Sequence, residues 1–245
     1  MRVTRIHVDA VLAVGITVVL PEAAATHLLR VLCLQAGDAC VLFNGDGCDY
    51  SARIIAIDKR AVRVEVGSMQ PLDNESPLRI VLLQALARGD KMDWILQKAT
   101  ELGVNAIIPM MTERSEVKLD AERSGKRASH WRNVIVSACG QSGRATVPSI
   151  AMASSLEQAL KVLPEGSQRL VLAPAAVRGL GDIAVSRNCV QVIAVGPEGG
   201  WSARDIMSLT GAGFAEVRLG PRILRTETAG IAAIATLQSR FGDLA

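Results

Sequence analysis

Residues 192–202 read VIAVGPEGGWS, a short apolar run followed by a glycine-rich turn and a serine. The run 192–195 is typical of a buried strand, because parallel strands covered on both faces are apolar throughout. Ser202 and Asp205 have the spacing of a capping box, which predicts that a helix begins there. Strand, turn and helix in this order predict a ligand site, since open α/β sheets bind ligands at the carboxyl ends of their strands.

A second turn of similar character, LGPRILRTETAG, spans residues 219–230. Two loops that end neighbouring strands would line one pocket, although a purely structural turn is the alternative for each. Neither the P-loop string nor the GxGxxG fingerprint is present, which argues against those two modes of phosphate binding. Polar residues precede an apolar helix at this turn, and they are Arg222, Arg225, Thr226 and Glu227. We expect these side chains to have protein partners or a ligand; the alternative is that they are solvated loop charges.

The segments around these loops alternate between strand and helix patterns, which predicts a mostly parallel sheet with covering helices. The helix over 90–102 should be capped by Asp90 and Asp93 and ended by Gly103. The last helix is rich in Ala and Ile on nearly every face, so the domain or a second subunit must bury it. The predicted elements are strands over 78–85, 106–110, 169–173, 190–195 and 215–219 and helices over 90–102 and 228–239.

The chain before residue 70 indicates short strands and turns, with one helix at about 22–31. Asn44–Gly47 contains the Asn-Gly and Asp-Gly pairs that favour hairpins. These patterns predict a small β-barrel with strands over 40–43, 49–57 and 61–66. The polar stretch QPLDNESP at 70–77 is typical of a linker, so we predict domains at 1–72 and 73–245.

The composition of the 245 residues is that of a globular protein, with 49% hydrophobic and 21% charged side chains. Five cysteines without a CxxC pair argue against a disulfide framework or a zinc site and favour the reducing cytoplasm. The apolar stretch near the start imitates a secretory signal, but Asp9 and Pro21 favour one or two short strands instead. No apolar run approaches the ~18 residues that would span a bilayer.

The densest cationic region lies between residues 113 and 144. It could follow a phosphate backbone or form a solvated helix face. Aromatic residues make up only 3% of the chain, so any nucleic acid would be bound through its phosphates and not by base stacking. His130 has no second ligand at metal spacing, and no GxSxG string favours a hydrolase, so we predict neither a metal nor hydrolase chemistry.

Together, several strings resemble the RsmE-type ribosomal RNA small-subunit methyltransferases. HLLRVL at 27–32 and FNGDG at 43–47 resemble the amino-terminal domain of that family. The remaining strings occur in the same order and spacing as in the family, and they are GDKMD (89–93), QKATELGV (97–104), TERS (112–115), QSGR (141–144), GPEGG (196–200) and LGPRILRTETA (219–229).

The resemblance implies an S-adenosylmethionine-dependent enzyme of the SPOUT superfamily that methylates N3 of a uridine in 16S rRNA. It also implies a PUA-like β-barrel, an α/β domain whose carboxyl-terminal part forms a trefoil knot, and a homodimer that needs no metal. A SPOUT enzyme acting on another RNA and a non-catalytic RNA-binding assembly factor are the alternatives. The family usually has a glutamate where this chain has Gly140, so no role of that carboxylate is carried over.

The resemblance also implies site residues. The catalytic residues are a hypothesis from the reaction and not from the resemblance: Arg225 or Arg222 would stabilise charge on the uracil, and Glu198 or Glu227 would help to remove its proton. The residues expected to bind RNA are Arg2, Arg5, Arg30, Arg88, Lys91, Arg114, Lys118 and Arg144. Those expected to bind the cofactor are Leu172, Pro174, Val195, Gly196, Pro197, Glu198, Gly199, Gly200, Leu219, Gly220, Arg222, Ile223 and Leu224.

Overall fold

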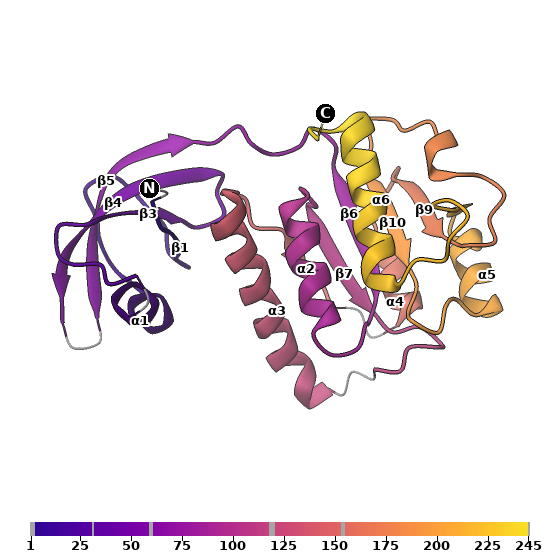
Figure 1. The fold of residues 1–245 in the computed structure, drawn as a ribbon, viewed down its shortest axis with the longest axis horizontal. Coiled ribbons are helices and arrows are strands. Elements are labelled where there is room, and N and C mark those ends of the chain that lie inside the picture. The colour runs from indigo at the N-terminus through magenta and orange to yellow at the C-terminus, as the bar shows by residue number, and fades with distance from the viewer. Residues whose placement is uncertain (1–2, 31, 59–60, 118–120, 153–154, 245) are drawn as a thin grey trace. The chain divides into compact units, whose positions relative to one another are not determined.

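The computed structural model describes residues 3–30, 32–58, 61–117, 121–152 and 155–244 (Figure 1). Its contacts divide the chain into two compact units. The first consists of Met1–Glu75 with Cys139–Val147, and the second of Ser76–Ala138 with Pro148–Ala245. The division near residue 75 lies close to the predicted linker. In contrast, the sequence analysis assigned Cys139–Val147 to the second domain, whereas this segment packs with the first unit.

The first unit contains a five-stranded sheet with the order β1-β3-β4-β5-β2. Its core contains an apolar cluster that includes Leu28, Leu42 and Ile54. The predicted hairpin joins β3 to β4, and Gly45 and Gly47 in its turn have φ of 97° and 89°, which favour glycine. The elements are β1 (Arg5–His7), β2 (Thr17–Val19), α1 (Glu22–Arg30), β3 (Ala39–Phe43), β4 (Cys48–Ile57) and β5 (Val62–Pro71).

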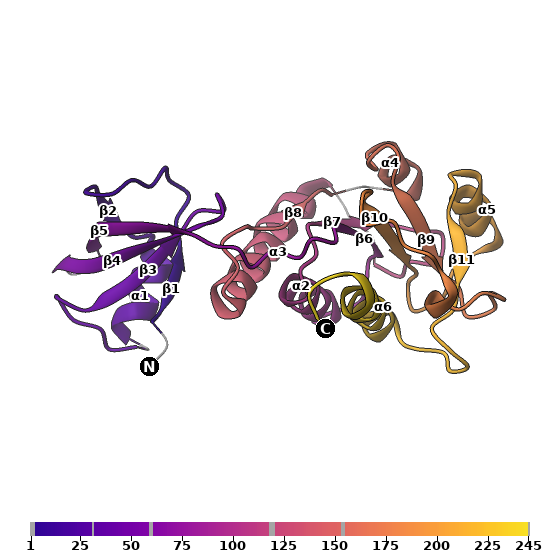
Figure 2. The ribbon, with the colours of Figure 1, turned by 90° about the horizontal axis from the view of Figure 1, so that it is seen from above.

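The second unit is built on a six-stranded, all-parallel sheet with the order β11-β9-β10-β6-β7-β8. Helices cover both faces, with α4 and α5 on one face and α2 and α6 on the other (Figure 2). The strands are β6 (Ile80–Ala85), β7 (Ala106–Met110), β8 (Ser149–Ile150), β9 (Gln168–Leu172), β10 (Gln191–Val195) and β11 (Ala215–Val217). The helices are α2 (Lys91–Glu101), α3 (Ala121–Ser142, whose end from Cys139 onward belongs to the first unit), α4 (Leu156–Lys161), a 3₁₀ turn (Leu180–Asp182), α5 (Ala203–Gly211) and α6 (Thr226–Phe241).

The helix termini confirm most of the predicted capping. Ser202 and Asp205 form the predicted capping box of α5. Gly103 follows α2 with φ of +82°, a conformation that disfavours other residues. The prediction that Asp90 caps α2 through its side chain is wrong, because its side chain makes no cap hydrogen bond and its backbone is already helical.

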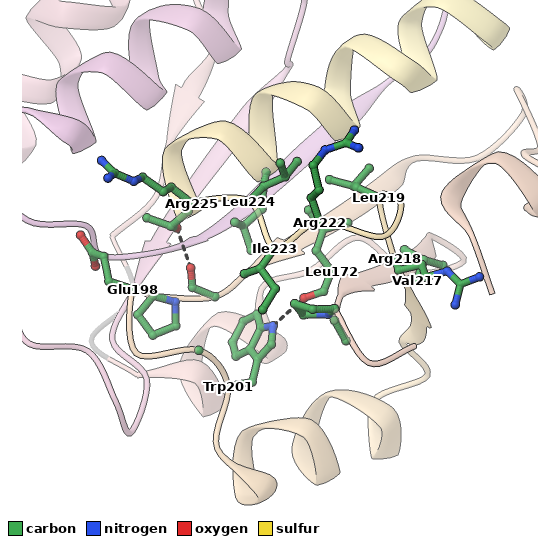
Figure 3. Close-up of a pocket in the computed structure, with 18 of the residues that line it drawn as sticks. Leu172, Glu198, Trp201, Val217, Arg218, Leu219, Arg222, Ile223, Leu224 and Arg225 are labelled. Carbon is green, nitrogen blue, oxygen red and sulfur yellow. Dashed lines mark hydrogen bonds between the residues drawn. The ribbon is translucent and has the colours of Figure 1, made fainter. Parts of the chain in front are cut away.

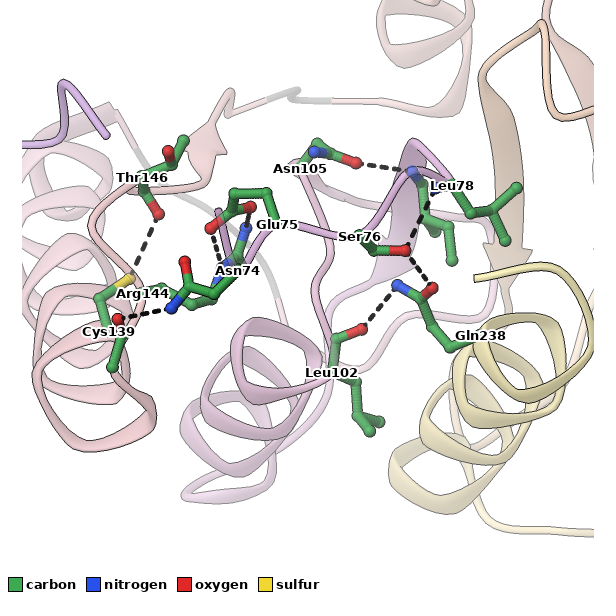
Figure 4. Close-up of polar contacts among 12 residues, drawn as sticks. Asn74, Glu75, Ser76, Leu78, Leu102, Asn105, Cys139, Arg144, Thr146 and Gln238 are labelled. Carbon is green, nitrogen blue, oxygen red and sulfur yellow. Dashed lines mark hydrogen bonds and ion pairs between the residues drawn. The ribbon is translucent and has the colours of Figure 1, made fainter. Parts of the chain in front are cut away.

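The final helix, α6, packs against α2 and β10 through one face. A buried amide reinforces this packing: Gln238 accepts from the Ser76 hydroxyl at 2.6 Å and donates to the Leu102 carbonyl at 2.9 Å (Figure 4). The second face keeps Ile231, Ala232 and other small residues only half-buried. The domain therefore buries one side of this helix.

Among the described residues, no helix is long and apolar enough to cross a membrane.

Candidate functional site

A pocket of about 400 Å³ lies where β9, β10 and β11 end (Figure 3). It is lined by every residue that the sequence analysis assigned to the cofactor except Gly199. The loops after these three strands come from segments far apart in the sequence, and the parallel sheet brings their ends together. Further residues line the pocket that were not predicted to bind the cofactor, namely Lys91, Trp201, Val217, Arg218, Arg225, Thr226 and Ala229.

The loop after β10 is fixed by Trp201. The indole Nε1 donates to the carbonyl of Leu172 at 3.0 Å, which joins the ends of β9 and β10 (Figure 3). The ring lies so close to Gly196 that a Cβ there would be 3.0 Å from Trp201 Cε2. A side chain at position 196 would therefore force the indole to shift, which favours glycine there.

Gly199 faces away from the pocket and toward the loop after β7. A Cβ at this position would lie 3.2 Å from the backbone oxygen of Arg114. The Arg114 guanidinium reaches the carbonyl of Gly199 at 3.4 Å. The glycine thus permits a close backbone approach between two of the motifs found in the sequence, TERS and GPEGG.

Three charged side chains meet at the rim of the pocket. The Lys91 ammonium lies 3.2 Å from Glu198 Oε1 and 3.7 Å from Glu227 Oε2. Glu198 Oε1 also accepts from the backbone amide of Arg88 at 3.2 Å. Burial alone would raise the pKa of Glu198, but the hydrogen bonds from Arg88, from its own backbone and from Lys91 outweigh burial and lower it.

Glu227 is stabilised less than Glu198. Among the described residues, no donor lies within hydrogen-bonding distance of its buried Oε2. Lys91 at 3.7 Å supplies an ion pair but not a hydrogen bond. The two carboxylates predicted to act in catalysis therefore share one cation and differ in how well their anions are solvated by the protein.

The loop between β11 and α6 exposes most of its side chains. Arg222 and Arg225 are exposed, and Ile223 is 83% exposed although it lines the pocket. In Figure 3, Ile223 points toward Trp201, while the guanidinium groups of Arg222 and Arg225 point away from that ring. The two arginines are thus free to reach a second molecule at the mouth of the pocket.

The residues predicted to bind RNA have different surroundings. Arg30 and Arg114 are exposed, Arg88 is exposed and pairs with Glu116, and Lys91 belongs to the pocket rim. Arg2 and Lys118 lie outside the described residues.

Arg5 and Arg144 have buried side chains that contact protein groups of the first unit. Arg5 pairs with Asp49 and donates to the carbonyls of Cys139 and Arg144. Arg144 Nε donates to Glu75 Oε1 at 2.9 Å (Figure 4). These contacts attach the segment 139–147 to the first unit, and they occupy groups that the sequence analysis had reserved for phosphates.

Comparison with known proteins defines the class to which the fold and pocket belong. Residues 74–238 match the model of the RNA methyltransferase domain, and residues 20–67 match that of the RNA methyltransferase PUA domain. The protein is thus an RNA methyltransferase with an amino-terminal PUA-like domain. The predicted fold class, a SPOUT α/β domain after a PUA-like domain, is confirmed; the trefoil knot stays a prediction.

The chain belongs to the ribosomal RNA small subunit methyltransferase E family, as predicted. The relative from Buchnera aphidicola subsp. Schizaphis graminum is 32% identical over 99% of this chain and 98% of its own. A structure of the Neisseria gonorrhoeae enzyme bound to S-adenosyl methionine is 40% identical, covers 100% of both chains and has a TM-score of 0.91. A Legionella pneumophila chain in complex with SAM is 38% identical, covers 99% of this chain and 100% of that one, and has a TM-score of 0.94.

Proposed function

We propose that this protein transfers the methyl group of S-adenosylmethionine to N3 of a specific uridine in 16S rRNA of the small ribosomal subunit. The observation that carries the proposal is the pocket at the ends of β9, β10 and β11, in a chain that matches SAM-bound relatives over nearly its whole length. The protein would act in the cytoplasm.

The pocket suits such a cofactor in size and chemistry. Its volume of about 400 Å³ falls in the range of small-molecule sites, roughly 300 to 1,000 Å³. Leu172, Trp201 and Leu224 offer apolar surface for a flat heterocycle. The backbone groups of Gly196 and Gly220 offer donors and acceptors, and Glu198 at the rim supplies negative charge near a cationic ligand.

The chemistry divides between positioning and proton removal. The bound cofactor supplies an already activated methyl group on its sulfonium. The loops after the three strands would hold it at near-attack distance, an effect worth up to ~7–11 kcal/mol. Uridine N3 carries a proton and becomes nucleophilic only as that proton leaves, so the protein must also provide a base or stabilise the developing anion.

Glu227 is the better of the two carboxylates for the base. Glu198 accepts hydrogen bonds from Arg88 and Lys91 that lower its pKa, so its anion takes up a proton poorly at neutral pH. Oε2 of Glu227 has no hydrogen-bond donor among the described residues. Glu198 would then orient Lys91 and the rim of the pocket.

Arg222 and Arg225 would stabilise negative charge on the uracil ring. Both are exposed at the mouth of the pocket, in the loop that leads into α6 and Glu227. Exposed Arg30 and Arg114 would contact phosphates. A second copy of the chain is supported by the half-buried Ile231 and Ala232 on α6 and by exposed Ile223, which would lose water on dimerisation.

The first experiment supplies labelled S-adenosylmethionine and the purified protein to unmodified small subunits and to naked 16S rRNA, then identifies the labelled nucleoside. Labelled 3-methyluridine is the expected product. Label on another RNA would favour the alternative target, and cofactor-free RNA binding without label would favour an assembly factor.

The base assignment is tested in single-turnover reactions. Glu227→Gln is expected to slow methyl transfer by about 10²- to 10⁴-fold with unchanged cofactor affinity, and Glu198→Gln to slow it much less. Glu157→Gln is the matched control, because Glu157 forms an exposed pair with Lys161 on α4. Equal rates for Glu227→Gln and this control would remove Glu227 from the base role.

A further inference from the structure

A fully buried amide lies in the central strand of the sheet. Gln84 is the one polar side chain in β6, whose sequence is IVLLQA, and it is 0% exposed. Burying an amide is costly unless it forms hydrogen bonds. Gln84 Nε2 donates to the carbonyl of Ala85 at 2.9 Å and to Thr226 Oγ1 at 3.1 Å.

Thr226 continues this chain of hydrogen bonds into the pocket. It is the first residue of α6, and its Oγ1 lies 2.6 Å from the carbonyl of Gly196. A hydroxyl has one hydrogen. Because Thr226 accepts from Gln84, its hydrogen is directed at Gly196. The amide orientation agrees, since a reversed amide would place two acceptors, Oε1 and the Ala85 carbonyl, against each other.

Gly196 is thereby held from two sides. Thr226 donates to its carbonyl, and the Trp201 ring lies so close to its Cα that a Cβ would be only 3.0 Å from Cε2 of the ring. The start of α6 is held in turn, because the Cα of Gly230 approaches Val195 and Gln84 to within the range where a Cβ would already be in contact. The hydrogen bonds from Gln84 to Thr226 and from Thr226 to Gly196 therefore fix the turn after β10 relative to α6.

We infer that Gln84 and Thr226 are positioning residues for the cofactor. They act through Gly196, whose backbone lines the pocket, and they hold it in the geometry that a ligand requires before the ligand arrives. Preorganisation of this kind increases affinity by reducing the ordering that accompanies binding. The inference rests on the proposed cofactor, and its test separates the two.

The test measures S-adenosylmethionine binding by calorimetry with full-length variants. Thr226→Val is isosteric and removes the donor; Thr226→Ala removes it in a smaller side chain and serves if Thr226→Val does not fold. Each is expected to weaken binding about tenfold, or about 1.4 kcal/mol. Thr226→Ser keeps the hydroxyl and should bind within twofold of the wild type. Gln84→Met should weaken binding about threefold.

Thr236→Val is the matched control. Thr236 lies on the same helix, and its hydroxyl donates to the backbone of Ala232 and not to the pocket. In steady-state assays, Thr226→Val should raise KM for the cofactor by a larger factor than it lowers kcat. A merely structural role would lower the melting temperature and kcat at unchanged KM.

Wild-type affinity in folded Thr226→Val and Thr226→Ala would overturn the inference, as would equal loss in Thr226→Ser. Wild-type affinity in Gln84→Met would remove Gln84 from it. If the wild type itself binds no S-adenosylmethionine, the proposed function fails and the inference fails with it, whereas a loss confined to the donor-deleting variants supports both.

Discussion

Glu198 illustrates how the same side chain can be a plausible base in the sequence and an unsuitable one in the fold. The sequence places it in a glycine-rich turn with no visible partner. The structure gives it a backbone donor from Arg88 and an ammonium from Lys91, both more than a hundred residues away in the chain. Its charge is therefore stabilised, and its role moves from proton transfer to organising the rim.

The lowered pKa of Glu198 predicts a pH-dependent contribution to stability. A carboxyl whose pKa is lower in the folded state stabilises the fold above its unfolded pKa and loses that contribution as pH falls through the folded value. Wild type should therefore exceed Glu198→Gln in melting temperature at pH 7, with a difference that shrinks below pH 4.5, the ordinary value. Melting curves from pH 7 to 3 check this, and a constant difference would contradict it.

The cysteines should differ sharply in reactivity. Burial raises the pKa of Cys40 and of Cys139 to about 11, and the Cys139 thiol also donates to the carbonyl of Thr146. Cys33 is exposed. At pH 8 a thiol reagent should modify Cys33 within minutes and leave Cys40 and Cys139 unmodified until the protein is denatured, because the thiolate is the reactive form. Peptide mass spectrometry identifies the modified sites; early labelling of Cys139 would contradict the prediction.

Among the elements, those with a strong local pattern were predictable. The apolar run of β10, the spacing of α2 and the capping box at Ser202 each carry their signal within a dozen residues. The first two strands were weaker, since β1 and β2 are only three residues long. Asp90 was predicted to cap α2, but its backbone already has helical dihedral angles and its side chain makes no cap hydrogen bond.

The site was predictable only where a motif named it. Glycine-rich loops at strand ends indicated the pocket, and the family resemblance supplied its residues. Trp201 has no spacing signal, because a single tryptophan after two glycines is unremarkable in a sequence. Gln84 and Thr226 are separated by 142 positions, so their hydrogen bond exists only once the parallel sheet has formed. Lys91 was predicted to bind RNA because the sequence shows its charge but does not show that Glu198 and Glu227 lie beside it in the fold.

The cap of α5 should affect both stability and the pocket, because the loop that lines the pocket ends at Ser202. Ser202→Ala is expected to lower stability by about 1 kcal/mol and to weaken cofactor binding severalfold. Ser155→Ala is the matched control, since Ser155 caps α4 through the amide of Gln158 and does not line the pocket. Urea denaturation and calorimetry together check this. If both variants bind the cofactor equally well, the cap does not organise the loop.

At the scale of the whole molecule, the chain passes between its two units three times, after residues 75, 138 and 147. The segment 139–147 returns to the first unit, and we call it the returning segment. Asn74 donates to the carbonyl of Gly143, and Glu75 pairs with Arg144 (Figure 4), so this segment is attached to the residues at which the chain first leaves the unit. The QSGR string, whose Arg144 was predicted to bind RNA, thus forms an internal part of the first unit.

Arg144 should therefore matter for stability and not for RNA. Arg144→Ala is expected to destabilise the protein by about 3 kcal/mol, because it removes one member of a largely buried pair. Measured well below the melting temperature, the slope of log affinity for RNA against log salt should not change. Exposed Arg30 is the comparison, and Arg30→Ala should reduce that slope by about 1. A reduced slope for Arg144→Ala would return it to the phosphate contacts.

The returning segment 139–147 also determines how such proteins can recombine. A PUA-like unit cut after Glu75 would leave behind Cys139–Val147, and with it the partners of Arg5 and Glu75. Exchange of this unit between relatives would succeed only if residues 1–75 and residues 139–147, which are distant in the sequence, were exchanged together. The amino-terminal unit is therefore not a module that can be moved by itself. Chimaeras that take residues 1–75 and 139–147 from the same parent should fold, whereas simple fusions at residue 75 should not.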